Sequence, residues 1–193
     1  MNYMSGETTN ELSNAIQSLT DRLLITEKQS IIVDQSTRRR QLILSSKIGK
    51  FEEAADLRKT VVSLLSATGT AITDADIDTC YVVGKKFRDK MRVAIELRHQ
   101  HTRDNIIRSR KSLKGKQDPT FGNFYISEGM CPAFAKLDYK CRLLKEKGFI
   151  DSTWFYNGRL YIILVQGGKK TPISHMQDLY EMFDTNAIDT LVR

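Results

Sequence analysis

Residues 152–164 read STWFYNGRLYIIL, and this stretch decides how the C-terminal part of the chain folds. Asn157-Gly158 strongly favours a two-residue β-turn, because such a turn needs residues that tolerate a positive φ angle. A turn of this length fixes the register of the flanking strands and places Trp154 opposite Tyr161. The stretch therefore predicts a β-hairpin whose two faces differ in chemistry.

One face of this hairpin is apolar and is expected to pack against the preceding helix; it consists of Phe155, Leu160, Ile162 and Leu164. The other face carries aromatic rings together with a cation, and it consists of Trp154, Tyr156, Arg159 and Tyr161. Rings beside an arginine are typical of a surface on which unpaired bases stack. The alternative is that a last helix covers Trp154 and Tyr161 through Met176, Leu179 and Phe183.

The segments around the hairpin complete a small α-β-β-α domain, which we expect over residues 129–184, with a tail at 185–193. Pro132 suits the first turn of a helix and Gly148 suits the residue after its end, so this helix is expected to stop near Lys147. Its apolar stripe is Phe134, Leu137, Cys141 and Leu144. Thr171-Pro172 is expected to begin the last helix, which runs through residue 183.

Upstream, residues 37–128 alternate between short apolar runs and helical periodicity. Strands are expected at 41–44, 77–83, 91–97 and 123–126, and helices at 51–66 and 102–114. The order βαββαβ is that of a split βαβ domain, similar to the RNA-recognition motif (RRM), with a four-stranded antiparallel sheet backed by two helices. The expected central strands contain no Phe or Tyr. We therefore expect this RRM-like domain to contribute electrostatic contacts rather than base stacking.

The first 36 residues contain a heptad seam. Apolar or small residues recur at alternating spacings of four and three, at Leu12, Ile16, Leu19, Leu23, Thr26, Ser30 and Val33. This spacing predicts a short coiled coil that joins copies of the chain into an oligomer. The alternative is an amphipathic helix that packs on its own domain. The overall fold class expected is α+β, with a coiled coil, an RRM-like domain and a C-terminal domain.

Positive charge concentrates in the middle of the chain. The net charge is +7, and residues 34–116 hold 19 Lys and Arg against 10 Asp and Glu. A polyanion is the natural partner of such a block, because phosphate neutralisation releases condensed counterions. Two alternatives are a basic surface that serves solubility and an anionic membrane surface. No apolar run reaches the length of a membrane span, and no secretory signal is visible. We expect a cytoplasmic ribonucleoprotein, with the nucleus as the alternative site, and no membrane partner.

The candidate nucleic-acid contacts are basic residues of both domains together with the hairpin aromatics. They are Arg38, Arg39, Arg40, Lys85, Lys86, Arg92, Arg103, Arg110, Lys111, Lys114, Lys136, Lys140, Lys145, Lys147, Trp154, Tyr156, Arg159 and Tyr161. Catalytic motifs are missing from the sequence, and the three histidines have no acid or nucleophile at suggestive spacing. Three dispersed cysteines without a histidine at ligand spacing indicate neither a disulfide framework nor a zinc site. We therefore expect that the protein is not an enzyme and that it binds no cofactor, metal or small-molecule substrate.

Several segments, in this order, resemble the first-open-reading-frame proteins of LINE-type retrotransposons. They are residues 34–43 (DQSTRRRQLI), 77–86 (IDTCYVVGKK), 103–115, 124–128, 143–148 and 154–162. The last three are also similar to the baculovirus few-polyhedra family. The resemblance implies a trimeric coiled coil, an RRM-like domain without stacking residues, and a C-terminal domain that together bind single strands and promote annealing.

The same resemblance implies nucleic-acid contacts at Arg38, Arg39, Arg103, Arg110, Lys145 and Arg159. It favours RNA, although no residue here demonstrably reads a 2′-hydroxyl, so DNA stays open. A second function class is also open: a viral structural or assembly protein of the few-polyhedra type. The chain departs from the retrotransposon pattern in its much shorter coiled coil and in Ser45-Ser46-Lys47, where the family usually has a glycine.

Overall fold

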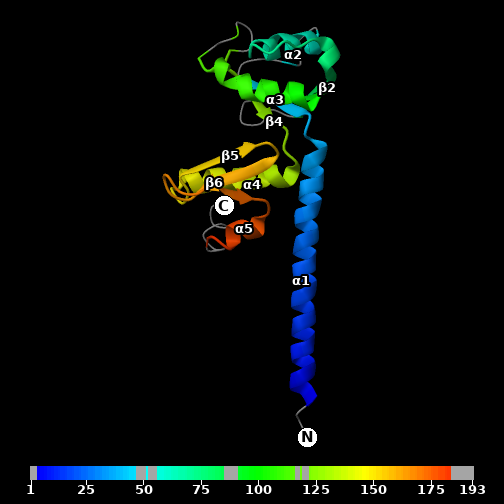
Figure 1. Cartoon of the computed structure of the whole chain (residues 1–193), viewed down its shortest axis with the longest axis vertical. Helices are drawn as coiled ribbons and strands as arrows, with labels where there is room; N and C mark the ends of the chain where they lie inside the picture. The colour runs from blue at the N-terminus through cyan, green and yellow to red at the C-terminus, as the bar shows by residue number, and fades with distance from the viewer. Residues whose placement is uncertain are drawn as a thin grey trace. The chain divides into compact units, whose positions relative to one another are not determined.

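The computed structural model (Figure 1) describes residues 4–46, 51, 56–84, 91–115, 118 and 122–183, with side chains of the first helix from residue 9 onward. It is an α+β protein with a long N-terminal helix, a four-stranded sheet and a three-stranded sheet. The chain divides into two units. The basic unit comprises residues 37–130 together with 155–158, and the C-terminal unit comprises residues 1–36, 131–154 and 159–193.

The basic unit follows the expected order of strands and helices. Its elements are β1 (Gln41–Ser46), α2 (Leu57–Ser66), β2 (Ile77–Val82), β3 (Met91–Leu97), α3 (Gln100–Ser109) and β4 (Phe124–Glu128), with short 3-10 turns at Asp74–Asp76 and Arg110–Leu113. The sheet is antiparallel in the order β2-β3-β1-β4. The prediction of a four-stranded antiparallel sheet is confirmed.

Alternation of buried and accessible side chains gives this sheet one core face. Leu42 and Leu44 of β1 are fully buried, whereas the residues between and beside them are partly accessible. Val61 of α2 and Ile106 of α3 belong to the same hydrophobic core. Each such side chain contributes roughly 1.5–3 kcal/mol when it is fully buried. Helix α2 begins later than the expected residue 51, because Asp56 caps it by accepting a hydrogen bond from the Lys59 amide.

A buried ion pair joins α3 to β4. Arg103 of α3 donates to the Glu128 carboxylate of β4 at 2.6 Å, and the two side chains are only 5 % and 1 % exposed. Arg103 also pairs with Asp104 at 2.6 Å. Glu128 accepts two further hydrogen bonds from the amides of Asn157 and Gly158, at 2.9 and 3.1 Å. The positive charge of Arg103 is therefore neutralised by two carboxylates of the protein itself.

The C-terminal unit consists of helices around a three-stranded sheet. Its elements are α1 (Met4–Thr37), α4 (Pro132–Glu146), β5 (Ser152–Tyr156), β6 (Arg159–Ile163), β7 (Thr171–Ile173) and α5 (Met176–Tyr180). Helix α4 ends as expected: Gly148 adopts a positive φ of 79°, and the Phe149 amide donates to the Leu144 carbonyl at 2.9 Å. The helix at 132–147 and the hairpin at 152–164 are both found.

The predicted helix at residues 171–183 is wrong at both ends, since the helix found spans only Met176–Tyr180. Residues 171–173 form strand β7, which pairs with β6 so that Pro172 lies opposite Tyr161. Proline is tolerated there because β7 is an edge strand, where one amide need not join the ladder. Helix α5 starts only after His175, where a capping box with Asp178 satisfies the first amides.

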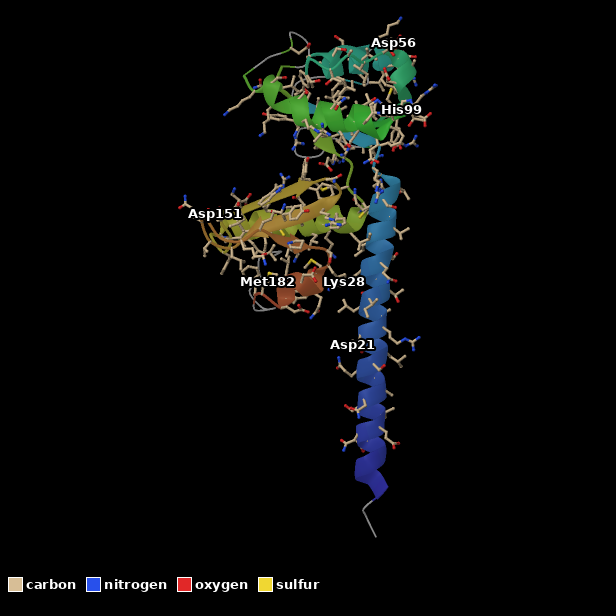
Figure 2. The ribbon with its side chains drawn as sticks, in the orientation of Figure 1. Asp21, Lys28, Asp56, His99, Asp151 and Met182 are labelled. Carbon is tan, nitrogen blue, oxygen red and sulfur yellow. The ribbon has the colours of Figure 1, made fainter. Side chains whose placement is uncertain are left out.

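The predicted N-terminal helix is confirmed, and its C-terminal part contacts other elements of its unit. Lys28, labelled in Figure 2, forms a 2.7 Å ion pair with Asp178 of α5. The Gln35 side chain accepts a hydrogen bond from the Cys131 amide at 2.8 Å. Burial opposes ionisation of Asp178, but hydrogen bonds from Lys28, Ser174 and the His175 amide together hold its pKa below the ordinary value.

Candidate nucleic-acid interface

Two aromatic rings and a lysine form a stack on the three-stranded sheet. The rings of Trp154 and Tyr161 are 5.7 Å apart between centroids, at an interplanar angle of 23°. The Lys170 ammonium lies 4.1 Å from the centre of the Tyr161 ring. Both rings are half-buried and Lys170 is exposed. We call Trp154, Tyr161 and Lys170 the aromatic stack.

The sheet explains why these three side chains meet. Asn157 and Gly158 have φ angles of 51° and 73°, so the turn is the one that the sequence predicts. The stacking of Trp154 on Tyr161 agrees with the expected hairpin register. Lys170 was missed by sequence reasoning, because it lies beside Tyr161 only if β7 is a strand. Two residues before Pro172, it shares the face of Tyr161 as a diagonal cross-strand neighbour.

The opposite face of the hairpin packs as expected, except at its end. Phe155, Leu160 and Ile162 are buried, whereas Leu164 is 42 % exposed. In α4, Cys141 is fully buried, and this burial raises the pKa of its thiol to about 12. Cys141 is therefore a core thiol and not a nucleophile at neutral pH.

The basic residues expected on α4 separate into accessible and buried ones. Lys136, Lys145 and Lys147 are exposed. Lys140 is 7 % exposed, because it lies one position from Cys141 and three from Leu137 on the packed side of the helix. At the hairpin tip, Tyr156 and Arg159 are exposed. Lys140 is therefore a packed residue and not an exposed cation of this surface.

Two of the three arginines before β1 make contacts within the protein. Arg38 is half-buried and donates to the Gln41 side chain at 3.5 Å. Arg40 pairs with Glu96 at 3.3 Å and donates to the Arg98 carbonyl at 3.2 Å, although its side chain remains 44 % exposed. Arg39 is exposed. Within this run, Arg39 is the most available cation for an external anion.

The second helix of the basic unit contributes fewer cations than expected. Arg103 is buried in its ion pair with Glu128, and Arg110 is half-buried and donates to the Ile126 carbonyl at 3.2 Å. Arg92 of β3 is half-buried, while Lys111 and Lys114 are exposed. Lys85 and Lys86 lie outside the described residues. We therefore consider Arg103 a structural residue and not an external contact.

The heptad seam of α1 lies on the surface. Its apolar side chains at Leu12, Ile16, Leu19, Leu23 and Val33 are each more than half exposed. Exposed leucines and isoleucines at this spacing favour association with another helix. Further toward the end of α1, Glu27, Lys28 and Gln35 make polar contacts with other elements of the same unit.

Comparison with known proteins gives no family assignment: no protein-family model matches the chain, and no curated protein matches its sequence. Among the described residues, no helix has the length and apolar character to cross a bilayer. The same residues contain no cluster of three or more potential metal ligands. The candidate interface consequently depends on the chemistry of the aromatic stack and the exposed cations.

Proposed function

We propose that this chain is a non-enzymatic protein that binds single-stranded nucleic acid, with RNA favoured, and acts as a nucleic-acid chaperone or coat. The observation that carries the proposal is the aromatic stack, in which two flat rings and an ammonium group share one face of a sheet. Each base that stacks on such a ring contributes ~1–3 kcal/mol, and a cation beside it can pair with a phosphate.

Exposed cations of both units support the same ligand. Lys136, Lys145, Lys147, Lys170 and Arg159 are accessible in the C-terminal unit, and Arg39, Lys111 and Lys114 are accessible in the basic unit. They attract any polyphosphate irrespective of its sequence. Flat rings add a preference for unpaired bases, because a base within a duplex is already stacked. Together, these features favour single strands over duplexes.

We further propose that the basic unit is an RRM-like domain. Its strand order β2-β3-β1-β4 and its two helices against one face agree with that fold. The exposed seam of α1 supports a coiled coil, and the resemblance to LINE-type proteins favours a trimer. In this proposal the protein forms a ribonucleoprotein in the cytoplasm or nucleus.

The few-polyhedra-type alternative, a viral assembly protein, is favoured by one observation: the exposed apolar seam would equally suit assembly into a larger particle. Binding measurements separate the two functions, because a nucleic-acid chaperone must bind and anneal strands, whereas an assembly factor need not.

The test uses the full chain with labelled single- and double-stranded RNA and DNA of one sequence in a filter-binding assay. We expect tighter binding to single strands and faster annealing of complementary strands. Trp154→Ala should weaken binding about fivefold or more, whereas Trp154→Phe, which keeps a ring, should weaken it less. Tyr139→Ala, at an exposed tyrosine of α4, is the matched control. If the parent and its three variants bind single strands with equal affinity, the aromatic stack is not part of the interface.

A further inference from the structure

The four-stranded sheet of the basic unit has a second face, opposite its hydrophobic core, which we call the open face. The register of the strands defines its two rows. The first row is Tyr81, Ala94, Ile43 and Ser127, and the second is Arg92, Ser45 and Tyr125. Residues paired across antiparallel strands point to the same side, so both tyrosines share this face.

Both tyrosines are accessible even though their neighbours along the chain are packed. Tyr81 is 54 % exposed, while Cys80 and Val82 on either side of it pack against the core. Tyr125 is 52 % exposed, between the buried Phe124 and Ile126. Between them, the central strands contribute the buried Ala94 together with Ile43, Ser45 and Arg92, which are half-buried. The aromatic residues of this face therefore lie on the two outer strands, whereas the expectation of no base stacking was based on the central strands alone.

We propose that the open face is a second stacking surface for single-stranded nucleic acid, with Tyr81 and Tyr125 as its two base contacts. This inference rests on the proposed function and deepens it. The strands are ~4.8 Å apart, so three spacings and one two-residue step along a strand separate the tyrosines by roughly 16 Å. A single strand several nucleotides long can reach both rings when it crosses the sheet from β2 to β4.

The charges on this face and at its end suit a polyphosphate. Arg92 lies in the row of Tyr125, and the carboxylate of Glu96 on the same face is paired with Arg40. Arg39 and Arg98, both exposed, lie where β1 begins and β3 ends. At the same end, Asp76 and the exposed Asp78 flank the start of β2. The four arginines therefore lie among three acidic residues, of which Glu96 is paired with Arg40. This complementarity favours nucleic acid over an apolar protein surface as the occupant.

The decisive experiment compares full-length Tyr81→Ala, Tyr125→Ala and the double variant with Tyr81→Phe/Tyr125→Phe and with Tyr139→Ala. Affinity for a fluorescein-labelled oligouridine is measured by anisotropy at several salt concentrations. Each single alanine variant should lose about fivefold or more in affinity, the factor that corresponds to ~1 kcal/mol per stacked base. The phenylalanine pair should retain most of the affinity, because the rings remain.

Salt dependence distinguishes stacking from charge. The tyrosine variants should keep the parental slope of log affinity against log salt concentration, since they remove no phosphate contact, whereas Arg39→Gln should make the slope shallower. Photocrosslinking with oligonucleotides that contain 4-thiouridine should label peptides that include Tyr81 or Tyr125. Thermal melting must show that the variants are folded, which is expected because both side chains are more than half exposed.

Three outcomes distinguish failure of this inference from failure of the proposed function. If the parent binds oligouridine and the double alanine variant binds equally well, the open face is not a stacking surface, while the proposed function stands. If the double variant changes the sedimentation of the protein but not its affinity, the face contacts another protein copy and the inference is overturned. If the parent binds no single strand even in dilute buffer, the proposed function fails first.

Discussion

Replacing Glu128 by glutamine tests the internal role of Arg103. The substitution preserves the size of the side chain and one acceptor oxygen, but it removes the charge that faces the guanidinium at 2.6 Å. Because Glu128 is only 1 % exposed, water cannot replace the lost interaction with the Arg103 charge on that side. Asp104 still pairs with Arg103 from a position that is 28 % exposed. The variant therefore leaves a buried cation with one anionic partner in place of two. Because glutamine has one acceptor oxygen where Glu128 uses two, at least one of the Arg103, Asn157 and Gly158 donors also loses its acceptor.

Loss of one member of a buried pair usually costs 3–5 kcal/mol, and the remaining Asp104 contact places Glu128→Gln near ~3 kcal/mol. For a chain of this length, each kcal/mol lowers the melting temperature by about 2–4 °C, so a decrease of roughly 6–12 °C is expected. Arg103→Met/Glu128→Leu should recover much of the loss, because it removes both charges and fills the space with apolar groups.

Circular dichroism melts measure the stability, and oligouridine binding is measured far below the melting temperature of each variant. The folded fraction of Glu128→Gln should bind like the parent, because Arg103 is not an external contact. A melting temperature within about 1 °C of the parent would refute the structural role. A stable, folded variant with greatly reduced affinity would instead place Arg103 at the interface, as the resemblance to LINE-type proteins implies.

Two further predictions concern the C-terminal unit and α1. Folding lowers the pKa of Asp178, so the stability that this carboxylate contributes is present at neutral pH and is lost as the pH falls below the ordinary carboxyl value of 3.8 and through the lower folded value. Asp178→Asn should therefore lower the free energy of unfolding at pH 7 and weaken its dependence on pH in the acid range. An unchanged dependence of stability on pH would exclude the Lys28–Asp178 pair as a stabilising contact. If α1 forms the proposed coiled coil, Leu19→Asp in the exposed seam should give monomers in analytical ultracentrifugation, whereas Asp21→Asn, beside it on α1, should not. A parent protein that sediments as a monomer at micromolar concentration would contradict the coiled coil.

Local chemistry in the sequence was sufficient to predict several elements. Asn157-Gly158 indicated the hairpin, Pro132 and Gly148 indicated the ends of α4, and short apolar runs indicated the strands of the basic unit. These signals act over a few residues and need no knowledge of distant contacts.

Contacts between distant segments account for what the sequence did not reveal. Arg103 looked like an external cation, because its partner Glu128 is 25 positions away and only the packing of α3 on β4 brings them together. Lys170 joined the aromatic stack only through the pairing of β7 with β6. The exposure of Tyr81 likewise depends on which face of the sheet the helices cover.

The salt dependence of single-strand binding tests the central claim most directly. Affinity of the full chain for oligouridine is measured between about 50 and 200 mM monovalent salt. Four phosphate contacts with a single strand would give a log–log slope of about −3 and a loss of roughly 50-fold over this range. A steep linear decrease is the result that we predict, with a residual affinity that Trp154→Ala lowers further. Absence of measurable binding at the lowest salt concentration would contradict the account.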